Sequence, residues 1–95
     1  MTEYYIYIIK CEKWKNGMFE REIYYTGMSS DVKRRFQEHK QGIRSNWMMN
    51  NNILPKELVY VELVGTDYYL TLKREKEIKH LSVVKKKKLV YDYSN

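Results

Sequence analysis

Residues 4–9 read YYIYII and residues 24–27 read YYTG, and these two stretches decide the fold. Tyr, Ile and Thr favour extended backbone, so residues 4–10 and 21–26 are predicted to form strands. Side chains alternate in direction along a strand, and both faces of the first strand are apolar. This pattern is typical of a central strand that is covered on both sides.

The polar segment between these strands, residues 11–20, contains Asn16-Gly17. This dipeptide is typical of a hairpin turn. The two strands are therefore predicted to be antiparallel neighbours. Gly27 is expected to end the second strand.

A helix is predicted next, over residues 30–41. Ser29 and Ser30 are suitable caps, Asp31 suits the positive first turn, and Gly42 is a stop signal. The helix should therefore follow the second strand almost directly.

The rest of the chain is predicted to contain a loop, one strand and two helices. The loop covers residues 42–55, with a turn of helix at 47–50. The strand covers residues 58–63, and the helices cover 67–80 and the segment from a Ser82 cap to Lys88. The expected order is β-β-α-β-α-α, a small α/β domain with helices against a three-stranded antiparallel or mixed sheet.

Length and composition favour one domain over residues 1–95 with a modest core. The net charge of +6 favours polyanionic partners, although solubility alone would also explain it. Cys11 is the single cysteine, which excludes an internal disulfide and a cysteine-based metal cage. Signal-peptide and membrane-helix patterns are absent from the sequence, so we expect an intracellular protein that does not contact a membrane.

Two polar side chains lie on the predicted buried face of the first helix. Val32, Phe36 and Ile43 recur at helical spacing and define this face. His39 falls within the face, and Arg35 falls at its margin. A structural explanation is also open, because such an arginine often pairs with a carboxylate and such a histidine often packs in the core.

The second predicted helix separates two similar carboxylates. Glu75 falls among Thr71, Leu72 and Ile78, which outline the apolar face, whereas Glu77 falls on the polar side. A carboxylate turned towards a sheet needs a cation or several hydrogen-bond donors.

Two kinds of cation are possible partners for Glu75. One is an arginine, either Arg35 or Arg74, and the other is a bound metal ion. The two are compatible if Arg35 and a metal ion share one pocket.

Tyr7 and Tyr25 lie on the two paired strands, so their phenols could enter one pocket. Together with Arg35, His39 and Glu75 they would supply the groups that phosphodiester hydrolysis needs. A guanidinium binds phosphate, a carboxylate holds a divalent cation, and a base activates water. A phenol becomes that base only if a cation lowers its pKa, so the imidazole is better matched.

In their order and spacing, five segments resemble the GIY-YIG nuclease superfamily, most closely its small stand-alone, UvrC-like members. Residues 5–7 (YIY) stand at the first motif, with Tyr replacing Gly, and residues 25–27 (YTG) stand at the second. Residues 31–39 (DVKRRFQEH) resemble the D-x-x-x-R-x-x-x-H helix. Residues 56–60 (KELVY) resemble the strand before the acidic helix, and residues 72–79 (LKREKEIK) resemble the E-x-x-I-K signature.

The resemblance implies a metal-dependent endonuclease that acts on DNA rather than RNA. It implies that Tyr25 lies near the attacking water or near the base that activates it, that Tyr7 assists, and that Arg35 binds and polarises the scissile phosphate. His39 would be a second base or would orient water. Glu75 would be the single protein ligand to Mg²⁺ or Mn²⁺.

The chain departs from that pattern at several positions. Met28 stands where some relatives have Lys, and residues 42–49 replace a Gly-Lys-x-x-x-Tyr-Thr-Arg-like stretch. The hairpin is long, and its residues 13–15 (KWK) could contact nucleic acid or could be an exposed tip. Two alternative functions therefore remain: a nucleic-acid-binding module with little activity, and a nuclease subunit that needs a protein partner, contacted by residues 47–49.

Overall fold

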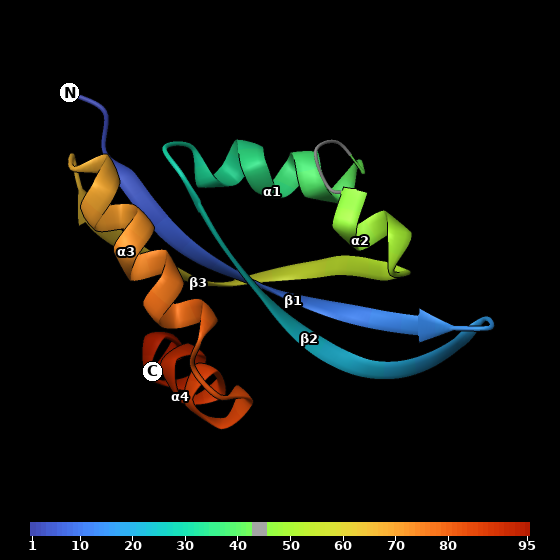
Figure 1. Ribbon diagram of the computed structural model, residues 1–95. Coiled ribbons are helices and arrows are strands. Elements are labelled where there is room, and N and C mark those ends of the chain that lie inside the picture. Colours follow the sequence, from blue (N-terminus) through green and yellow to red (C-terminus); the bar gives the residue numbers. More distant parts are fainter. Residues whose placement is uncertain (43–45) are drawn as a thin grey trace.

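The computed structural model describes residues 1–42 and 46–95, with Asn46 described by its backbone only. Its elements follow the predicted order, including the helical turn that was expected within the loop after the first helix (Figure 1). They are β1 (Tyr4–Lys15), β2 (Met18–Ser29), α1 (Val32–Lys40), α2 (Asn46–Asn50), β3 (Ile53–Gly65), α3 (Tyr68–Lys79) and α4 (Val83–Ser94). The α/β class is confirmed, and so is the helical turn expected at residues 47–50.

The three strands form one antiparallel sheet in the order β2-β1-β3, so β1 is central as predicted. β1 and β2 are longer than expected. The turn between them contains only Asn16 and Gly17, whose φ angles of 53° and 76° suit a tight hairpin. Most of residues 11–20 therefore belong to the two strands rather than to a loop. The β1–β2 ladder continues as far as the Lys15–Met18 pair.

β3 and α4 also exceed their predicted lengths. β3 pairs with β1 from Ile53 to Gly65, and it includes Pro55, which an edge strand tolerates. Ser82 caps α4 as predicted, but the helix runs on past the lysines because Leu89 and Val90 pack against the core.

Two helix starts show which residue caps each helix. Asp31, rather than Ser29 or Ser30, is the cap of α1, where its carboxylate accepts from the Arg34 N–H. Ser29 lies at the end of β2 instead. Asp67 caps α3 by accepting from two backbone N–H groups.

The sheet carries a separate core cluster on each face. Tyr7, Ile9 and Cys11 of β1 pack with α1 and α2, on the upper side in Figure 1. Ile6 and Ile8 of β1 face the other way and pack with α3 and α4. Ile43, which the sequence placed on the buried face of α1, lies outside the described residues. Among the described helices, none has the length and apolar character needed to span a membrane.

Candidate active site

Tyr7 and Gly27 form the base of the candidate site. They are opposite each other in the β1–β2 register, and the Tyr7 ring folds over Gly27. A Cβ atom at position 27 would overlap Tyr7 Oη and lie 2.5 Å from Cζ. Gly27 was predicted to end its strand, but β2 continues to Ser29. Its glycine identity instead leaves room for the phenol.

His39 of α1 contacts both phenols. A hydrogen bond of 3.0 Å joins its Nε2 to Tyr7 Oη, and the imidazole tautomer determines which atom donates. The His39 ring also meets the Tyr25 ring edge-on, with centroids 5.3 Å apart. Tyr7 and His39 are 2% and 4% exposed, so their hydrogen bond lies in the interior.

Burial keeps all three of these groups neutral near neutral pH. Loss of hydration raises the pKa of both Tyr7 and Tyr25, and the Glu75 carboxylate raises each further. Burial likewise lowers the pKa of His39, and the positive charge of Arg35 lowers it further. A neutral imidazole beside neutral phenols is the available proton acceptor.

The Arg35 guanidinium lies near the same groups, four residues before His39 on α1. Its positive charge lowers the pKa of both phenols, which opposes the larger effect of burial. Its ion pair with Glu38 is long, at 3.9 Å, and its side chain is 30% exposed. A partly exposed pair of this length contributes little stability, so the guanidinium can turn to another anion.

Glu75 approaches from α3, and its charge reaches both Tyr7 and Tyr25. The sequence separated Glu75 from Glu77 correctly, because their side chains are 16% and 53% exposed. Its recorded ion pair is with Lys79 at 3.5 Å, one turn along the helix. The sequence suggested Arg35 or Arg74 as the arginine that pairs with Glu75, and both suggestions were wrong.

Arg74 instead attaches α3 to the sheet. Its guanidinium donates to both carboxylate oxygens of Glu62, at 2.7 and 2.9 Å. The buried Tyr60 hydroxyl donates to the same carboxylate. This fork-to-carboxylate contact fixes the rotation of α3, and thereby the direction of the neighbouring Glu75.

Residues 3–88 match the GIY-YIG catalytic domain. The chain belongs to the GIY-YIG family. GIY-YIG nucleases act on nucleic acid, so the family assigns this chain to a nuclease superfamily. No solved structure matches the chain significantly.

Several small proteins of the family are similar to this chain over nearly its whole length. The UPF0213 protein of Staphylococcus saprophyticus is 38% identical, over 95% of this chain and 96% of its own length. The UPF0213 protein of Natronomonas pharaonis is 33% identical, over 96% and 94%. UPF0213 protein YhbQ of Escherichia coli K12 is 32% identical, over 95% and 79%. The stand-alone form expected from the sequence is thus found in these relatives.

The donor set of this GIY-YIG site fits a hard divalent cation that keeps much of its hydration. Within residues 1–42 and 46–95 there is no cluster of three or more His, Cys, Asp or Glu side chains suited to a metal. Glu75 would thus be a single carboxylate ligand. Mg²⁺ commonly binds proteins through one or two carboxylates, with water and substrate phosphate completing its shell.

Trp47, which the sequence suggested as a protein contact, is a neighbour of the site. Its ring stacks on Tyr25, with centroids 5.9 Å apart and an angle of 29° between the planes. The adjacent Met48 is buried in the core, whereas Met49 is exposed. No local sequence pattern predicts the Tyr25–Trp47 stack, because the two residues are distant in sequence and meet only in the folded structure.

The hairpin residues considered for nucleic-acid contact have partners within the hairpin. Lys13 pairs with Glu20 at 3.8 Å. The Trp14 indole N–H donates to Glu12, and its ring packs edge-on against Phe19. These contacts give Lys13 and Trp14 a structural role within the hairpin.

Proposed function

We propose that this GIY-YIG protein is a metal-dependent endonuclease that hydrolyses phosphodiester bonds in DNA. The observation that carries the proposal is the convergence of five side chains from four elements. They are Tyr7 of β1, Tyr25 of β2, Arg35 and His39 of α1, and Glu75 of α3. Each supplies a group that phosphodiester hydrolysis uses.

Arg35 binds and polarises the scissile phosphate. Its fork of N–H donors matches two phosphate oxygens, and its pairing with Glu38 at 3.9 Å is easily given up. The positive charge also stabilises the negative charge that develops at phosphorus in the transition state.

Tyr7 and His39 remove the proton from the attacking water. The Tyr7 hydroxyl accepts the water proton as it passes its own proton to neutral His39 across the 3.0 Å hydrogen bond. This relay avoids a lasting phenolate, which burial disfavours. Tyr25 packs against the imidazole and orients the water beside it.

Glu75 holds the divalent cation, Mg²⁺ or Mn²⁺. When bound, the cation polarises the phosphate and stabilises the leaving oxygen. The Lys79 partner of Glu75 is 47% exposed, and such pairs within a helix contribute only about 0.3–0.5 kcal/mol. Glu75 can therefore exchange the ammonium group for a metal ion at small cost.

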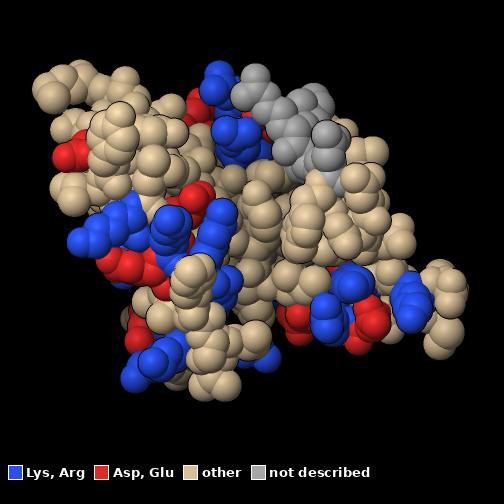
Figure 2. Space-filling view, in the orientation of Figure 1, with Lys and Arg blue, Asp and Glu red and all other residues tan. Residues whose placement is uncertain are grey.

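The charge distribution supports a polyanionic substrate. Figure 2 shows Lys and Arg side chains gathered over α3 and over α1, on either side of the band where β2 crosses. Acidic partners lie among them, as in the Arg74–Glu77 pair of α3, and also on the hairpin, as in the Lys10–Glu22 pair. A phosphate backbone lying across β2 would meet cations from both helices.

One observation favours the alternative of a binding module without activity. Glu75 is already ion-paired, and the positive field would hold nucleic acid even without a metal ion. Such a protein would show salt-dependent binding and no cleavage. A partner-dependent nuclease would show cleavage only after the partner is added.

The test of the nuclease proposal uses purified protein on supercoiled, single-stranded and branched DNA, with the matching RNA, in Mg²⁺ or Mn²⁺. We expect strand cleavage by the wild type that chelation stops and that Glu75→Ala loses. Glu77→Ala serves as the matched control and should cleave normally. Equal background from the wild type and Glu75→Ala on every substrate would reject the proposal.

A further inference from the structure

A groove runs along the outer edge of β2, beside the candidate active site. It has a volume of about 360 Å³, and Tyr25, Trp47, Lys79 and Lys86 are among its lining residues. That volume is within the range of about 300–1,000 Å³ common for small-molecule sites. We call it the β2-edge groove.

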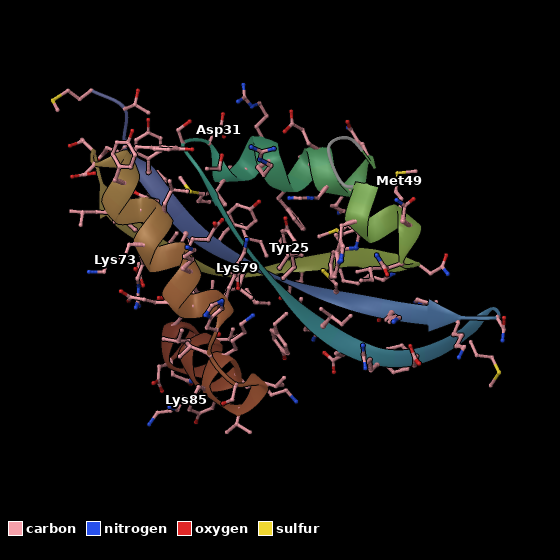
Figure 3. All side chains as sticks on the ribbon, in the orientation of Figure 1. Tyr25, Asp31, Met49, Lys73, Lys79 and Lys85 are labelled. Atoms are coloured by element: carbon pink, nitrogen blue, oxygen red, sulfur yellow. The ribbon has the colours of Figure 1, made fainter. Side chains whose placement is uncertain are left out.

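The β2-edge groove combines residues from four elements. Trp47 comes from α2, on the face that carries the active-site phenols, whereas Lys79 and Lys86 come from α3 and α4 on the other face. Figure 3 shows Lys79 reaching towards the part of β2 that carries Tyr25. The groove is therefore open to a chain that passes across the edge of the sheet.

Trp47 offers a flat apolar surface in this groove. One side of its indole stacks on Tyr25, and the residue is still 51% exposed. Trp47 also lines a second hollow of about 400 Å³ that continues past Tyr24, Lys86 and Arg21. The exposed indole thus lines both hollows.

The two lysines place positive charge beside that indole. Lys86 Nζ donates to the Tyr24 carbonyl oxygen at 3.4 Å, and no ion pair involves Lys86 within the described part of the chain. Burial lowers the pKa of Lys86, and the nearby positive charge of Lys79 lowers it further. An anion between the two ammonium groups would relieve their repulsion.

We propose that the β2-edge groove binds an unpaired nucleotide of the substrate. Its base stacks on Trp47, and its phosphate contacts Lys86 and Lys79. The proposal rests on the nuclease function and extends it, because Tyr25 and Lys79 are shared with the active site. It adds a binding site for a nucleotide that lies next to the scissile phosphate on the substrate strand.

The requirement for an unpaired nucleotide follows from stacking. Inside a duplex, both faces of a base are covered by neighbouring bases, so an indole cannot reach them. A flipped-out or single-stranded base has a free face, and base–aromatic stacking tolerates any base type. The β2-edge groove therefore selects strand structure rather than sequence.

The test measures binding of fluorescently labelled single-stranded and blunt duplex oligonucleotides by anisotropy, in EDTA. Stacking of one base on an aromatic side chain corresponds to about a 5- to 150-fold change in affinity. We expect Trp47→Ala to lose single-strand affinity within that range and Trp47→Phe to retain most of it. Duplex affinity should change little in either variant.

The lysine contacts are tested by the salt dependence of single-strand binding. Lys86→Gln should reduce the salt slope by about 0.7, the value for one phosphate contact on a single strand. Lys85→Gln is the control, because Lys85 lies on the same helix outside the groove (Figure 3). Its salt slope should match that of the wild type.

Fluorescence gives a second, direct measurement. In a Trp14→Phe protein, Trp47 is the remaining tryptophan, and a stacked base should quench its emission as single strands are added. Unchanged emission at saturation, unchanged affinity of Trp47→Ala, or equal losses on duplex and single strand would each overturn the proposal. Circular dichroism of each variant confirms that it is folded.

The binding test is independent of the nuclease proposal. Because EDTA removes metal ions, selective loss of binding in Trp47→Ala would support the groove even if cleavage is never seen. Conversely, metal-dependent cleavage with normal binding by Trp47→Ala would leave the nuclease function intact and reject the groove.

Discussion

The hydroxyl of Tyr7 lies 3.0 Å from Nε2 of His39, in the interior of the protein. This contact links the central strand to α1 across 32 positions of sequence. It joins a phenol whose pKa is raised by burial to an imidazole whose pKa is lowered by burial. Proton transfer along this pair is the step that we expect to activate water.

Replacing Tyr7 by Phe removes the hydroxyl and keeps the ring. We expect the DNA cleavage rate to fall by about 10²- to 10⁴-fold, the usual contribution of a positioned acid or base. The free energy of unfolding should fall by about 0.5–1.5 kcal/mol, measured by urea denaturation. Tyr60→Phe is the matched control, since Tyr60 is also buried and hydrogen-bonded but faces α3 and α4. It should lose similar stability and keep its activity.

The cleavage rate should depend on the protonation of His39. Its pKa is lowered from 6.5 by burial, so the imidazole is neutral and the rate is high at pH 6.5, and the acidic limb of the pH–rate profile lies below that pH. The acidic limb of the pH–rate profile should disappear in His39→Gln. A limb that persists in this variant would assign the titration to another group.

The same shift makes the fold acid-sensitive. The unfolded chain binds a proton at His39 more readily than the folded chain does. The contribution of His39 is therefore complete above the unfolded pKa and declines as the pH falls through it. Nuclear magnetic resonance titration of His39 should give a pKa below the ordinary histidine value of 6.5.

Gly27→Ala places a methyl group where the Tyr7 ring lies. Because this ring is 2% exposed and closely packed, we expect a loss of about 1–3 kcal/mol in unfolding free energy, together with reduced cleavage. The loss should shrink when Tyr7 is also replaced by Ala, since the clash is then absent. Strictly additive losses in this double-mutant cycle would contradict the contact.

Arg35→Lys preserves the charge and removes the forked donor. We expect cleavage to fall by about 10²-fold, as when one oxyanion donor is removed, while stability changes by less than about 0.5 kcal/mol. The adjacent, exposed Arg34 provides the control, and Arg34→Lys should cleave normally. Equal activity of the two variants would remove Arg35 from the site.

Local sequence patterns predicted the order of elements and the two faces of β1. Helical spacing also separated Glu75 from Glu77, because side-chain direction repeats with the helical turn. The exposed fractions of these two side chains confirm that separation. Such features depend on residues close together in the chain.

Features that depend on distant residues were missed or predicted wrongly. β3 extends from Ile53 to Gly65 because β1 pairs along its whole length, which local turn signals do not reveal. Gly27 was predicted as a strand end because a glycine in sequence is a turn signal, whereas the Tyr7 ring sets its role. Arg74 pairs with Glu62 of β3, twelve residues away, rather than with its neighbour Glu75.

The most direct test of the proposed active site is the position of Mn²⁺ in crystals soaked with that ion, located by its anomalous scattering. We predict one Mn²⁺ at the Glu75 carboxylate, with the Lys79 ammonium displaced and Arg35, Tyr7 and Tyr25 directed towards the ion. Crystals of Glu75→Gln should lack that peak. Active, Mn²⁺-dependent protein whose manganese binds away from Glu75 would contradict the assignment of the site.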